Sequence, residues 1–236
     1  MNKLTITLAF LVVLLFALPA SAQPELGIIG GVNFSTVSLD PEQNIDINTG
    51  TGFSAGGMFV YNFNERFSLQ VEPTYMRRNV DFTATDVGES PFTNVTLEAT
   101  QKATYIDVPV LMRVSFGEAD VKPYLLAGPD IGFLSSSKQK FNKVIADGED
   151  ITNMFTSSEL EEDVKDETRS IDLCMNFGGG VSVPVGNNHL FLEAQYSLGL
   201  INIDDTQPEP GQEDATIKSR GIQIKGGITF PIGIRH

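Results

Sequence analysis

The stretch YIDVPVLMRVSFG (Tyr105–Gly117) decides the fold, because it places two charged residues inside an apolar run. Every second residue from Ile106 onward is apolar, whereas Asp107 and Arg113 fall together on the other face. A period of two is typical of a β-strand, and ionised side chains are almost never fully buried without partners. We therefore expect the two faces of this strand to meet different surroundings.

The same alternation recurs along the chain and predicts eight strands, each with one largely apolar face. The expected strands span residues 26–34, 53–63, 67–78, 105–116, 121–133, 171–183, 190–200 and 222–232. Three short connections, at 64–66, 117–120 and 186–188, alternate with four long ones, at about 36–50, 79–100, 135–168 and 202–215. This alternation places all short turns at one end and all long loops at the other, which is typical of transmembrane barrels.

The predicted fold class is therefore all-β, an eight-stranded antiparallel up-and-down transmembrane β-barrel with short periplasmic turns and four long external loops. The alternating connections disfavour a soluble barrel whose apolar face points inward. Aromatic residues on the apolar faces suit a bilayer, since Tyr61 follows Phe53 by eight residues and Tyr75 follows Phe67 by eight. Eight residues cover roughly 20 Å of height in a strand tilted by about 40°. An even strand number leaves both termini on the periplasmic side.

The first residues have the pattern of a secretory signal peptide. Lys3 precedes an apolar run at 4–18, and Ala20-Ser21-Ala22 fits a signal peptidase site. An N-terminal membrane anchor is the alternative, but the run is shorter than the roughly 20 residues that a spanning helix needs. The expected division is a signal peptide at residues 1–22 and an outer-membrane β-barrel domain at residues 23–236.

Charge and cysteine content narrow the classes of partner. Removal of residues 1–22 takes away Lys3 and no acid, which leaves 15 basic and 30 acidic side chains. This excess of acid argues against nucleic acid, and against anionic membrane surfaces, as partners. The one cysteine, Cys174, has no second thiol with which to form an internal disulfide.

Several segments resemble the PorT-like outer-membrane β-barrel family of Gram-negative bacteria. They are GIIGGVNFS, YIDVPVLMRVSFG, KPYLLAGPDIGFL, QYSLGLINI and the closing GGITFPIGIRH, in the order found in that family. The resemblance implies an eight-stranded outer-membrane barrel but no single activity, although the family takes its name from a member linked to protein secretion. Such barrels usually end on an aromatic residue read by the barrel assembly machinery. This chain ends on His236, and Phe230 is the expected substitute.

We expect no catalytic, metal or cofactor site. The only histidines are His189, beside a short turn, and His236 at the end of the chain, so neither should lie in an external or lumenal cleft. A histidine-dependent hydrolase is therefore a poor fit. One cysteine and two separated histidines offer no zinc ligand cluster. The glycine-rich stretch at 177–186 follows a strand pattern and does not open a helix, so it does not predict phosphate binding.

The polar faces of the strands direct nine charged residues into the predicted lumen: Glu72, Arg78, Asp107, Arg113, Lys122, Asp130, Asp172, Glu193 and Lys225. An eight-stranded barrel is just wide enough for its own side chains to fill. Residue counts from the short turns place Asp107 and Asp130 near one level, where they would share Lys225. Glu72 and Arg113 are expected to pair at a lower level. We expect these charges to plug the barrel as a salt-bridge network.

Glycine pairs at 30–31, 56–57 and 226–227 lie on strands that become neighbours when the barrel closes. They predict a glycine-rich wall, because glycine weakens a strand unless curvature or close packing requires it. Large residues on the facing strands, among them Tyr105, Leu111 and Tyr124, are expected to fill the space that this wall leaves.

The long loops hold 21 of the 30 acidic residues. A solvated surface is the plain interpretation, and the alternative is binding of divalent cations that bridge the loops to lipopolysaccharide. The expected function is a structural or surface-interaction role with a plugged polar lumen. A narrow passive channel for ions or very small solutes, and an accessory subunit of an envelope or secretion assembly with its own protein partners, are the alternatives.

Overall fold

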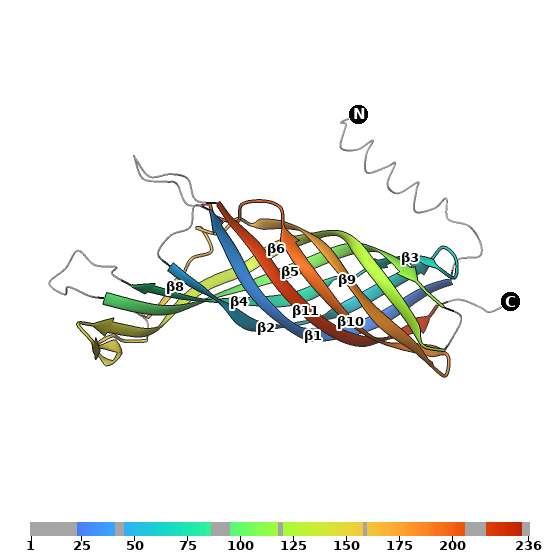
Figure 1. The fold of residues 1–236 in the computed structure, drawn as a ribbon, viewed down its shortest axis with the longest axis horizontal. Helices are drawn as coiled ribbons and strands as arrows, with labels where there is room; N and C mark the ends of the chain where they lie inside the picture. The colour runs from blue at the N-terminus through green and yellow to red at the C-terminus, as the bar shows by residue number, and fades with distance from the viewer. Residues whose placement is uncertain are drawn as a thin grey trace, which may run out of the picture.

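The computed structural model describes residues 23–40, 45–85, 95–117, 120–157, 160–205 and 216–232. Strands dominate these residues (Figure 1). The elements are β1 (Gln23–Asp40), β2 (Ile45–Asn62), β3 (Phe67–Val71), β4 (Thr74–Thr85), β5 (Val95–Ser115), β6 (Lys122–Ala146), β7 (Glu149–Asp150), a 3-10 helix (Thr152–Met154), β8 (Glu161–Asp163), β9 (Ile171–Val185), β10 (Asn188–Gly199) and β11 (Thr216–Pro231). The expected signal peptide at 1–22 and the terminal His236 lie outside the described residues.

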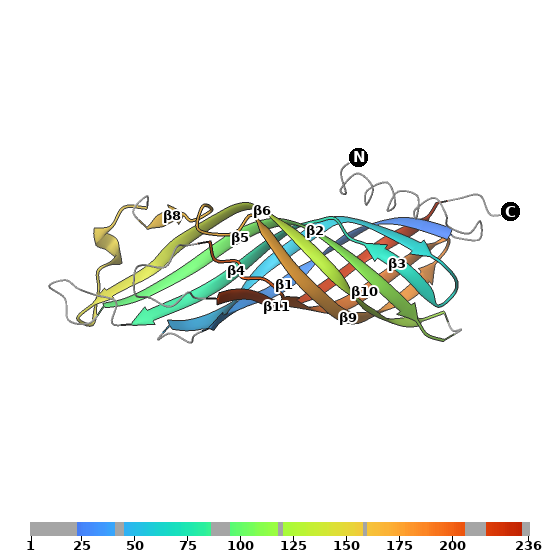
Figure 2. The ribbon, with the colours of Figure 1, turned by 90° about the horizontal axis from the view of Figure 1, so that it is seen from above.

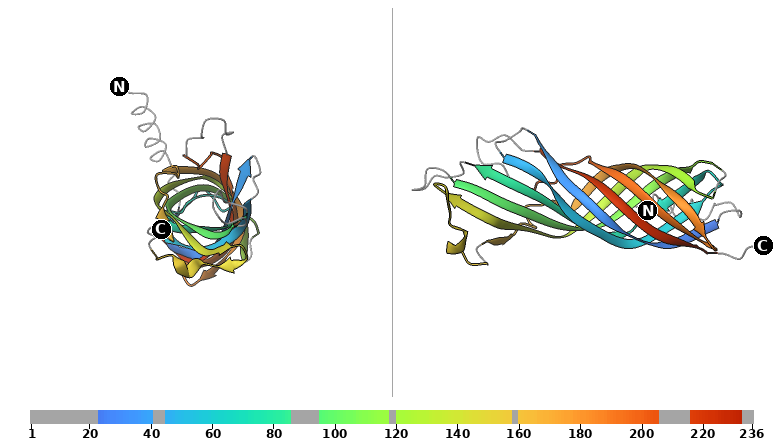
Figure 3. Two further views of the ribbon diagram at one scale, coloured as in Figure 1. Left: turned by 90° about the vertical axis from the view of Figure 1, so that its left-hand side faces the viewer. Right: turned by 60° about the horizontal axis from the view of Figure 1, so that its bottom comes forward.

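Eight antiparallel strand positions close into a barrel, which is seen end-on in Figure 3. β3 and β4 together form the third wall strand, interrupted at Glu72 and Pro73, and both pair with β2 and β5. The first and last strands complete the ring, since β1 pairs with β11 from Glu25 to Asp40. The predicted fold class is confirmed.

The two ends of the barrel differ. Both described chain ends lie beside the short turns at 63–66, 116–121 and 186–187, at what we call the turn end (Figures 1 and 2). The opposite end, with the long connections, is called the loop end. Gly117 and Gly186 adopt positive φ values of 81° and 65° in two of the tight turns, a backbone region that favours glycine.

The outer wall carries an apolar band, as the alternation of the strands predicts. The large apolar residues exposed on it include Ile28, Val32, Phe53, Ile106, Val110, Leu125, Ile131, Phe177, Leu192, Ile222 and Phe230. Aromatic contacts lie at both edges of the band, where Phe53 meets Tyr75 at 6.1 Å and Tyr61 meets Phe63 at 5.3 Å between ring centroids. No helix in the described part of the chain is long and apolar enough to span a bilayer.

The strands run farther at the loop end than the sequence indicates. Much of the expected loops at 36–50, 79–100 and 135–168 is strand, because β5 begins at Val95 and β6 continues to Ala146. Lys143, inside the connection predicted at 135–168, pairs with Glu98 in the β5–β6 ladder. Two register shifts interrupt that ladder, at Glu98/Ala99 and Thr104/Tyr105. The β4–β5–β6 sheet therefore projects beyond the apolar band, and β8 pairs along its edge (Figure 2).

The expected glycine wall divides between the two faces. Gly30 and Gly57 lie on the lipid-facing side, where an added Cβ would meet nothing closer than 3.6 Å and 3.9 Å. Gly31 and Gly227 face inward, and a Cβ there would lie 2.2 Å and 2.1 Å from backbone oxygens of the neighbouring strand. Only the inward member of each pair is required by close approach of the strands.

Candidate functional site

The lumen is the candidate functional site, because it holds most of the buried polar side chains. Those that are almost completely buried include Gln70, Glu72, Asp107, Asp130, Asp172, Asn176, Glu193, Gln195 and Lys225. Burial of so many polar groups is tolerated only when they bind one another. Their contacts form three groups along the barrel axis.

The group toward the turn end is centred on Lys225. Its ammonium donates to Glu72 and lies 3.6 Å from Glu193 Oε1, and the Lys225 side chain is only 2% exposed. Gln70 donates to Glu193 Oε2 at 3.1 Å, and the Tyr124 hydroxyl donates to the same oxygen at 3.0 Å. The cation and both carboxylates thus form one network that joins opposite walls of the barrel.

Arg113 closes this group on its turn-end side. Its guanidinium carbon lies 3.6 Å from the centroid of the Tyr124 ring, and its Nη1 lies 3.5 Å from Gln70 Oε1. A guanidinium held over an aromatic face is stabilised by the negative potential of the ring. Arg113 therefore packs as a cap over the Lys225 network and forms no ion pair with any residue that the structure describes.

The group toward the loop end is centred on Arg78. Its Nη2 donates to both oxygens of Asp107 at 2.9 Å, and its Nη1 donates to Asp172 Oδ2 at 2.6 Å. The guanidinium also lies 4.5 Å from the centroid of the Tyr105 ring. Ser219 donates a further hydrogen bond to Asp172 Oδ2 at 2.8 Å. One arginine therefore joins carboxylates from β5 and β9 across the lumen.

A chain of uncharged donors and acceptors lies between the two ionic groups. Gln223 donates to Ser197, Ser197 donates to Asn176 Oδ1, and Asn176 donates to Asp130 Oδ2 at 3.1 Å. The other oxygen of Asp130 is buried and has no hydrogen-bond partner among the described residues. Asp130 is thus the least compensated carboxylate of the lumen.

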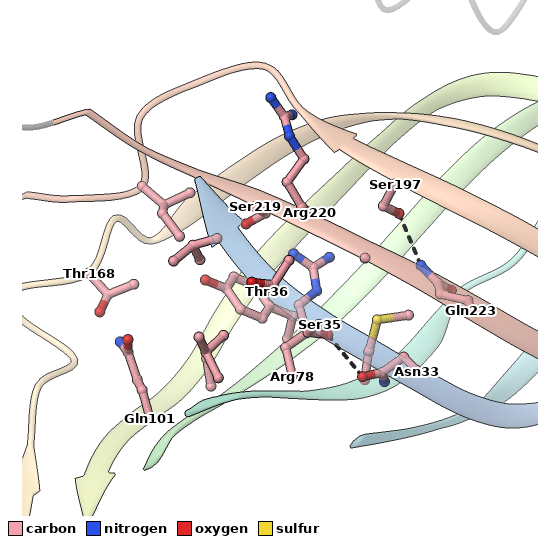
Figure 4. Close-up of a pocket in the computed structure, with 17 residues that line it drawn as sticks. Asn33, Ser35, Thr36, Arg78, Gln101, Thr168, Ser197, Ser219, Arg220 and Gln223 are labelled. Atoms are coloured by element: carbon pink, nitrogen blue, oxygen red, sulfur yellow. Dashed lines mark hydrogen bonds between the residues drawn. The ribbon is translucent and has the colours of Figure 1, made fainter. Parts of the chain in front are cut away.

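Cavities lie on either side of the buried groups. At the turn end a vestibule of about 710 Å³ is lined by residues that include Glu25, Arg113, Lys122 and His189. At the loop end a cavity of about 50 Å³ reaches Arg78 (Figure 4), and one of about 280 Å³ lies farther out. The polar groups around Lys225 and Arg78 therefore separate two vestibules.

The pairings differ from those that the sequence suggests. Lys225 pairs with Glu72 and Glu193 instead of Asp107 and Asp130. Residue counts from the turns ignore the stagger between neighbouring strands, which tilts the wall and changes the level of each side chain.

Two further positions differ from expectation. Arg113 contacts Tyr124 and Gln70, and the expected pair with Glu72 is not formed. Lys122 is exposed at the turn-end vestibule, outside the buried groups. The remaining predicted residues, Arg78, Asp107, Asp130, Asp172 and Glu193, all lie inside the lumen.

Uncharged residues complete the network and were not expected in it. Gln70, Asn176, Gln195 and Ser219 are buried and bind its carboxylates. They stand on the polar faces of their strands, so the period-two pattern contains their signal. The sequence interpretation considered only charged residues, although amides supply the additional hydrogen bonds that buried charges need.

The described residues offer little for catalysis. His189 Nδ1 lies 3.3 Å from Glu25 Oε2 at the turn-end vestibule, and the Thr229 hydroxyl donates to the same carboxylate. The hydroxyl therefore contacts the acid, and not the imidazole that would have to activate it as a nucleophile. No group of three or more His, Cys, Asp or Glu side chains in the described part of the chain is arranged to hold a metal ion.

Known structures with a related shape are distant in sequence. The attachment invasion locus protein Ail of Yersinia pestis is 15% identical, covers 88% of this chain and 99% of its own, and has a TM-score of 0.37. Neisserial surface protein A is 14% identical, covers 88% and 97%, and has a TM-score of 0.42. OprG of Pseudomonas aeruginosa is 11% identical, covers 92% and 98%, and also has a TM-score of 0.42.

Sequence comparison gives a clearer result. No curated protein matches the chain significantly. The family model described as "Outer membrane protein beta-barrel domain" matches residues 21–205, which is most of the sequence. That match agrees with the closed ring of eight strand positions and its apolar outer band. The chain belongs to the outer membrane protein beta-barrel domain family.

Proposed function

We propose that the protein is a closed outer-membrane barrel with a structural or surface-interaction role. The observation that carries this proposal is the pair of ionic groups around Lys225 and Arg78, which join opposite walls of the lumen. Passage of an ion along the axis requires these contacts to open, and opening leaves buried charges without partners. The barrel therefore conducts poorly in its ground state.

The orientation follows from the unequal ends of the barrel. Short turns and both described chain ends lie at the turn end, which faces the periplasm, whereas the projecting β4–β5–β6 sheet lies outside the cell (Figure 1). Barrels of this kind have short periplasmic turns and longer external segments. The projecting sheet supplies the surface for interaction. The segments that resemble PorT-like outer-membrane barrels favour the same orientation, with the turn end in the periplasm.

Trypsin treatment of intact cells tests this orientation. Lys165 is exposed in the connection between β8 and β9, so cleavage is expected there, whereas Lys143 is held inside the β5–β6 ladder and should be cut more slowly. The variant Lys165→Gln should lose the fragment that begins at Asp166, while the exposed Arg169 of the same connection is still cleaved. Cleavage at the turn-end residue Arg66 of intact cells, with Lys165 protected, would reverse the orientation.

Ion flux from liposomes tests the closed lumen. Purified wild-type protein in potassium-loaded vesicles should release potassium no faster than the protein-free vesicles do. Rapid release by the wild type would favour a narrow channel. The lumen holds five carboxylates against Arg78, Arg113 and Lys225, so such a channel would prefer cations to anions.

Co-purification from gently solubilised membranes tests the accessory role. A stand-alone barrel should be recovered without a stoichiometric envelope protein, apart from transient contact with the barrel assembly machinery. Recovery of a stoichiometric partner would show that the barrel acts as a subunit of an envelope or secretion assembly. We also propose that it has no catalytic role, because the Thr229 hydroxyl beside the His189–Glu25 pair donates to Glu25 and is not activated by the imidazole.

A further inference from the structure

Basic side chains gather on the outer wall directly beyond the apolar band at the loop end. We define this basic belt by six residues: Arg77, Lys102, Lys138, Arg169, Lys218 and Arg220. Each lies two to five residues along the chain from an exposed apolar residue at the edge of the band, namely Tyr75, Ile106, Phe133, Ile171 or Ile222. Alternation along β4 and β11 directs Arg77, Lys218 and Arg220 to the same face as the apolar residues. The close-up in Figure 4 shows the Arg220 side chain extending away from the lumenal cavity.

Carboxylates at the level of the belt come from β8 and the segments near Arg169, since Glu161 and Asp163 lie beside Lys138 and Asp205 lies beside Arg169. On β4, β5, β6 and β11 the first two outward positions beyond the band contain no Asp or Glu. Lys138 pairs with Glu161 at 2.8 Å, and Arg169 lies 3.7 Å from Asp205. Four belt residues form no ion pair with a carboxylate among the described residues: Arg77, Lys102, Lys218 and Arg220.

The belt also contains an unfavourable pairing. Lys102 of β5 stands directly opposite Lys138 of β6, and like charges in that position destabilise a sheet. Glu161 offsets part of this repulsion, because the hydrogen bond from Lys138 lowers the pKa of the Glu161 carboxyl. Lys102 forms no ion pair of its own among the described residues and shares the attraction of Glu161 with Lys138 and Lys140. This arrangement points to an external anion that lies against the wall between β4 and β6.

The height of the belt identifies that anion. Long basic side chains just beyond an apolar band reach the level of lipid headgroups while their stems cover apolar surface. The protein belongs to an outer-membrane family, and with its loop end outward the headgroups at this level are those of lipopolysaccharide. We propose that the basic belt binds the phosphate groups of lipopolysaccharide directly, without a bridging divalent cation. The proposal rests on the orientation given under the proposed function.

The net acidic charge of the chain does not prevent the basic belt from binding a phosphate group. The overall excess of acid argues against anionic surfaces, but five acidic residues are buried in the lumen, and others among the described residues, such as Glu149 and Asp150 of β7, lie beyond the belt. Charges separated by more than about 10 Å are largely screened at ordinary ionic strength. A phosphate group beside Lys102 thus experiences mainly the neighbouring belt residues.

Binding of lipid A, the phosphorylated anchor of lipopolysaccharide, tests the proposal. Detergent-solubilised protein is titrated with bis-phosphorylated lipid A, and the wild type is compared with the variant Arg77→Gln/Lys102→Gln/Lys218→Gln. Loss of three basic groups near a charged membrane surface is expected to weaken binding on the order of a hundredfold. The matched control is Arg66→Gln/Lys143→Gln/Lys165→Gln, which makes the same charge change outside the belt and should stay within twofold of the wild type. Equal weakening by both triple variants would overturn the proposal.

Three further conditions of the lipid A titration identify which chemical group the belt binds. Binding by the wild type should persist in EDTA, should disappear with dephosphorylated lipid A, and should resist competition by inorganic phosphate. Loss of binding in EDTA would show that divalent cations form the bridge, and complete displacement by inorganic phosphate would show a site for free anions. Either result would overturn direct binding of the lipid.

A charge-conserving variant separates charge from a folding defect. Arg77→Lys/Lys102→Arg/Lys218→Arg should bind lipid A within a few-fold of the wild type, and a loss as large as that of the glutamine variant would contradict the proposal. Binding in detergent does not depend on orientation in the cell. Failure of this titration is therefore distinct from failure of the trypsin experiment.

Discussion

Lys225 is the residue on which the turn-end part of the lumen depends. It is buried, and it alone contributes a positive charge within 4 Å of Glu72 and Glu193 among the described residues. Buried charges are stable only while they are paired and hydrogen-bonded. The energetic role of Lys225 is thus to hold two carboxylates in the lumen at the same time.

The variant Lys225→Ala is expected to lower the free energy of unfolding by about 3–5 kcal/mol, because it leaves Glu72 and Glu193 buried without a cation. Urea unfolding in lipid vesicles measures the change. Lys122→Ala, which removes an exposed lysine at the turn end, is the control and should have little effect. Adding Glu72→Gln and Glu193→Gln to Lys225→Ala should recover part of the loss. A stability equal to that of the wild type for Lys225→Ala would contradict this role.

The glycines of β1 and β2 give a second prediction for single residues. Gly31→Ala should lower the free energy of unfolding by about 1–3 kcal/mol, since its Cβ would lie 2.2 Å from Ile224 O and overpack the wall. Gly57→Ala is the matched control on the lipid-facing side, with its nearest atom at 3.9 Å. It should be neutral or slightly stabilising. Similar losses for both variants would show that close approach is not the reason for Gly31.

At the scale of the element, β5 shows how one strand serves two surroundings. Val110 is 37% exposed on the lipid-facing side, whereas Leu111 is completely buried in the lumen. The strand continues beyond the bilayer from Tyr105 back to Val95, where its partner is the extended part of β6. The outward face of β5 thus meets lipid in the half near the turn end and water in the half near the loop end.

Two arginine substitutions in β5 test whether its outward face meets lipid and its inward face meets water. Val110→Arg should cost about 2–4 kcal/mol of folding free energy, because it places a charge on the lipid face near the middle of the bilayer. Ser115→Arg should cost much less, since Ser115 lines the hydrated turn-end vestibule. Refolding into lipid vesicles, followed by urea titration, measures both variants. Equal costs would indicate a soluble barrel.

The sequence predicts elements better than it predicts their ends or their contacts. Alternation in Tyr105–Gly117 gives the strand and both of its faces, because neighbouring side chains point to opposite sides. It does not give the start of β5 at Val95, since the segment before Tyr105 leaves the bilayer and loses its apolar face. Nor does it give the partner of Lys225, because the level of a side chain depends on the stagger of every strand between. Strand identity is local information, whereas lumenal pairing is a property of the closed ring.

At the scale of the whole molecule, the charges are sorted by surroundings. The apolar band forms the outer wall, the lumen holds paired charges, and basic residues around Lys102 lie just beyond the band. Most of these charges have a partner or contact with water, whereas one buried oxygen of Asp130 has no hydrogen-bond partner among the described residues. We therefore propose that the paired lumenal charges and the basic belt both suit the barrel to an outer membrane.

Single-channel recording in planar bilayers tests the closed lumen most directly. The wild type is compared with the double variant Arg78→Ala/Lys225→Ala, which removes the cation from each ionic group. We predict no steady conductance for the wild type and brief, cation-selective openings for the double variant, because its carboxylates no longer join the two walls. A stable open channel in the wild type, with an ion selectivity altered by Lys225→Ala, would contradict the plugged lumen and establish the barrel as a narrow channel.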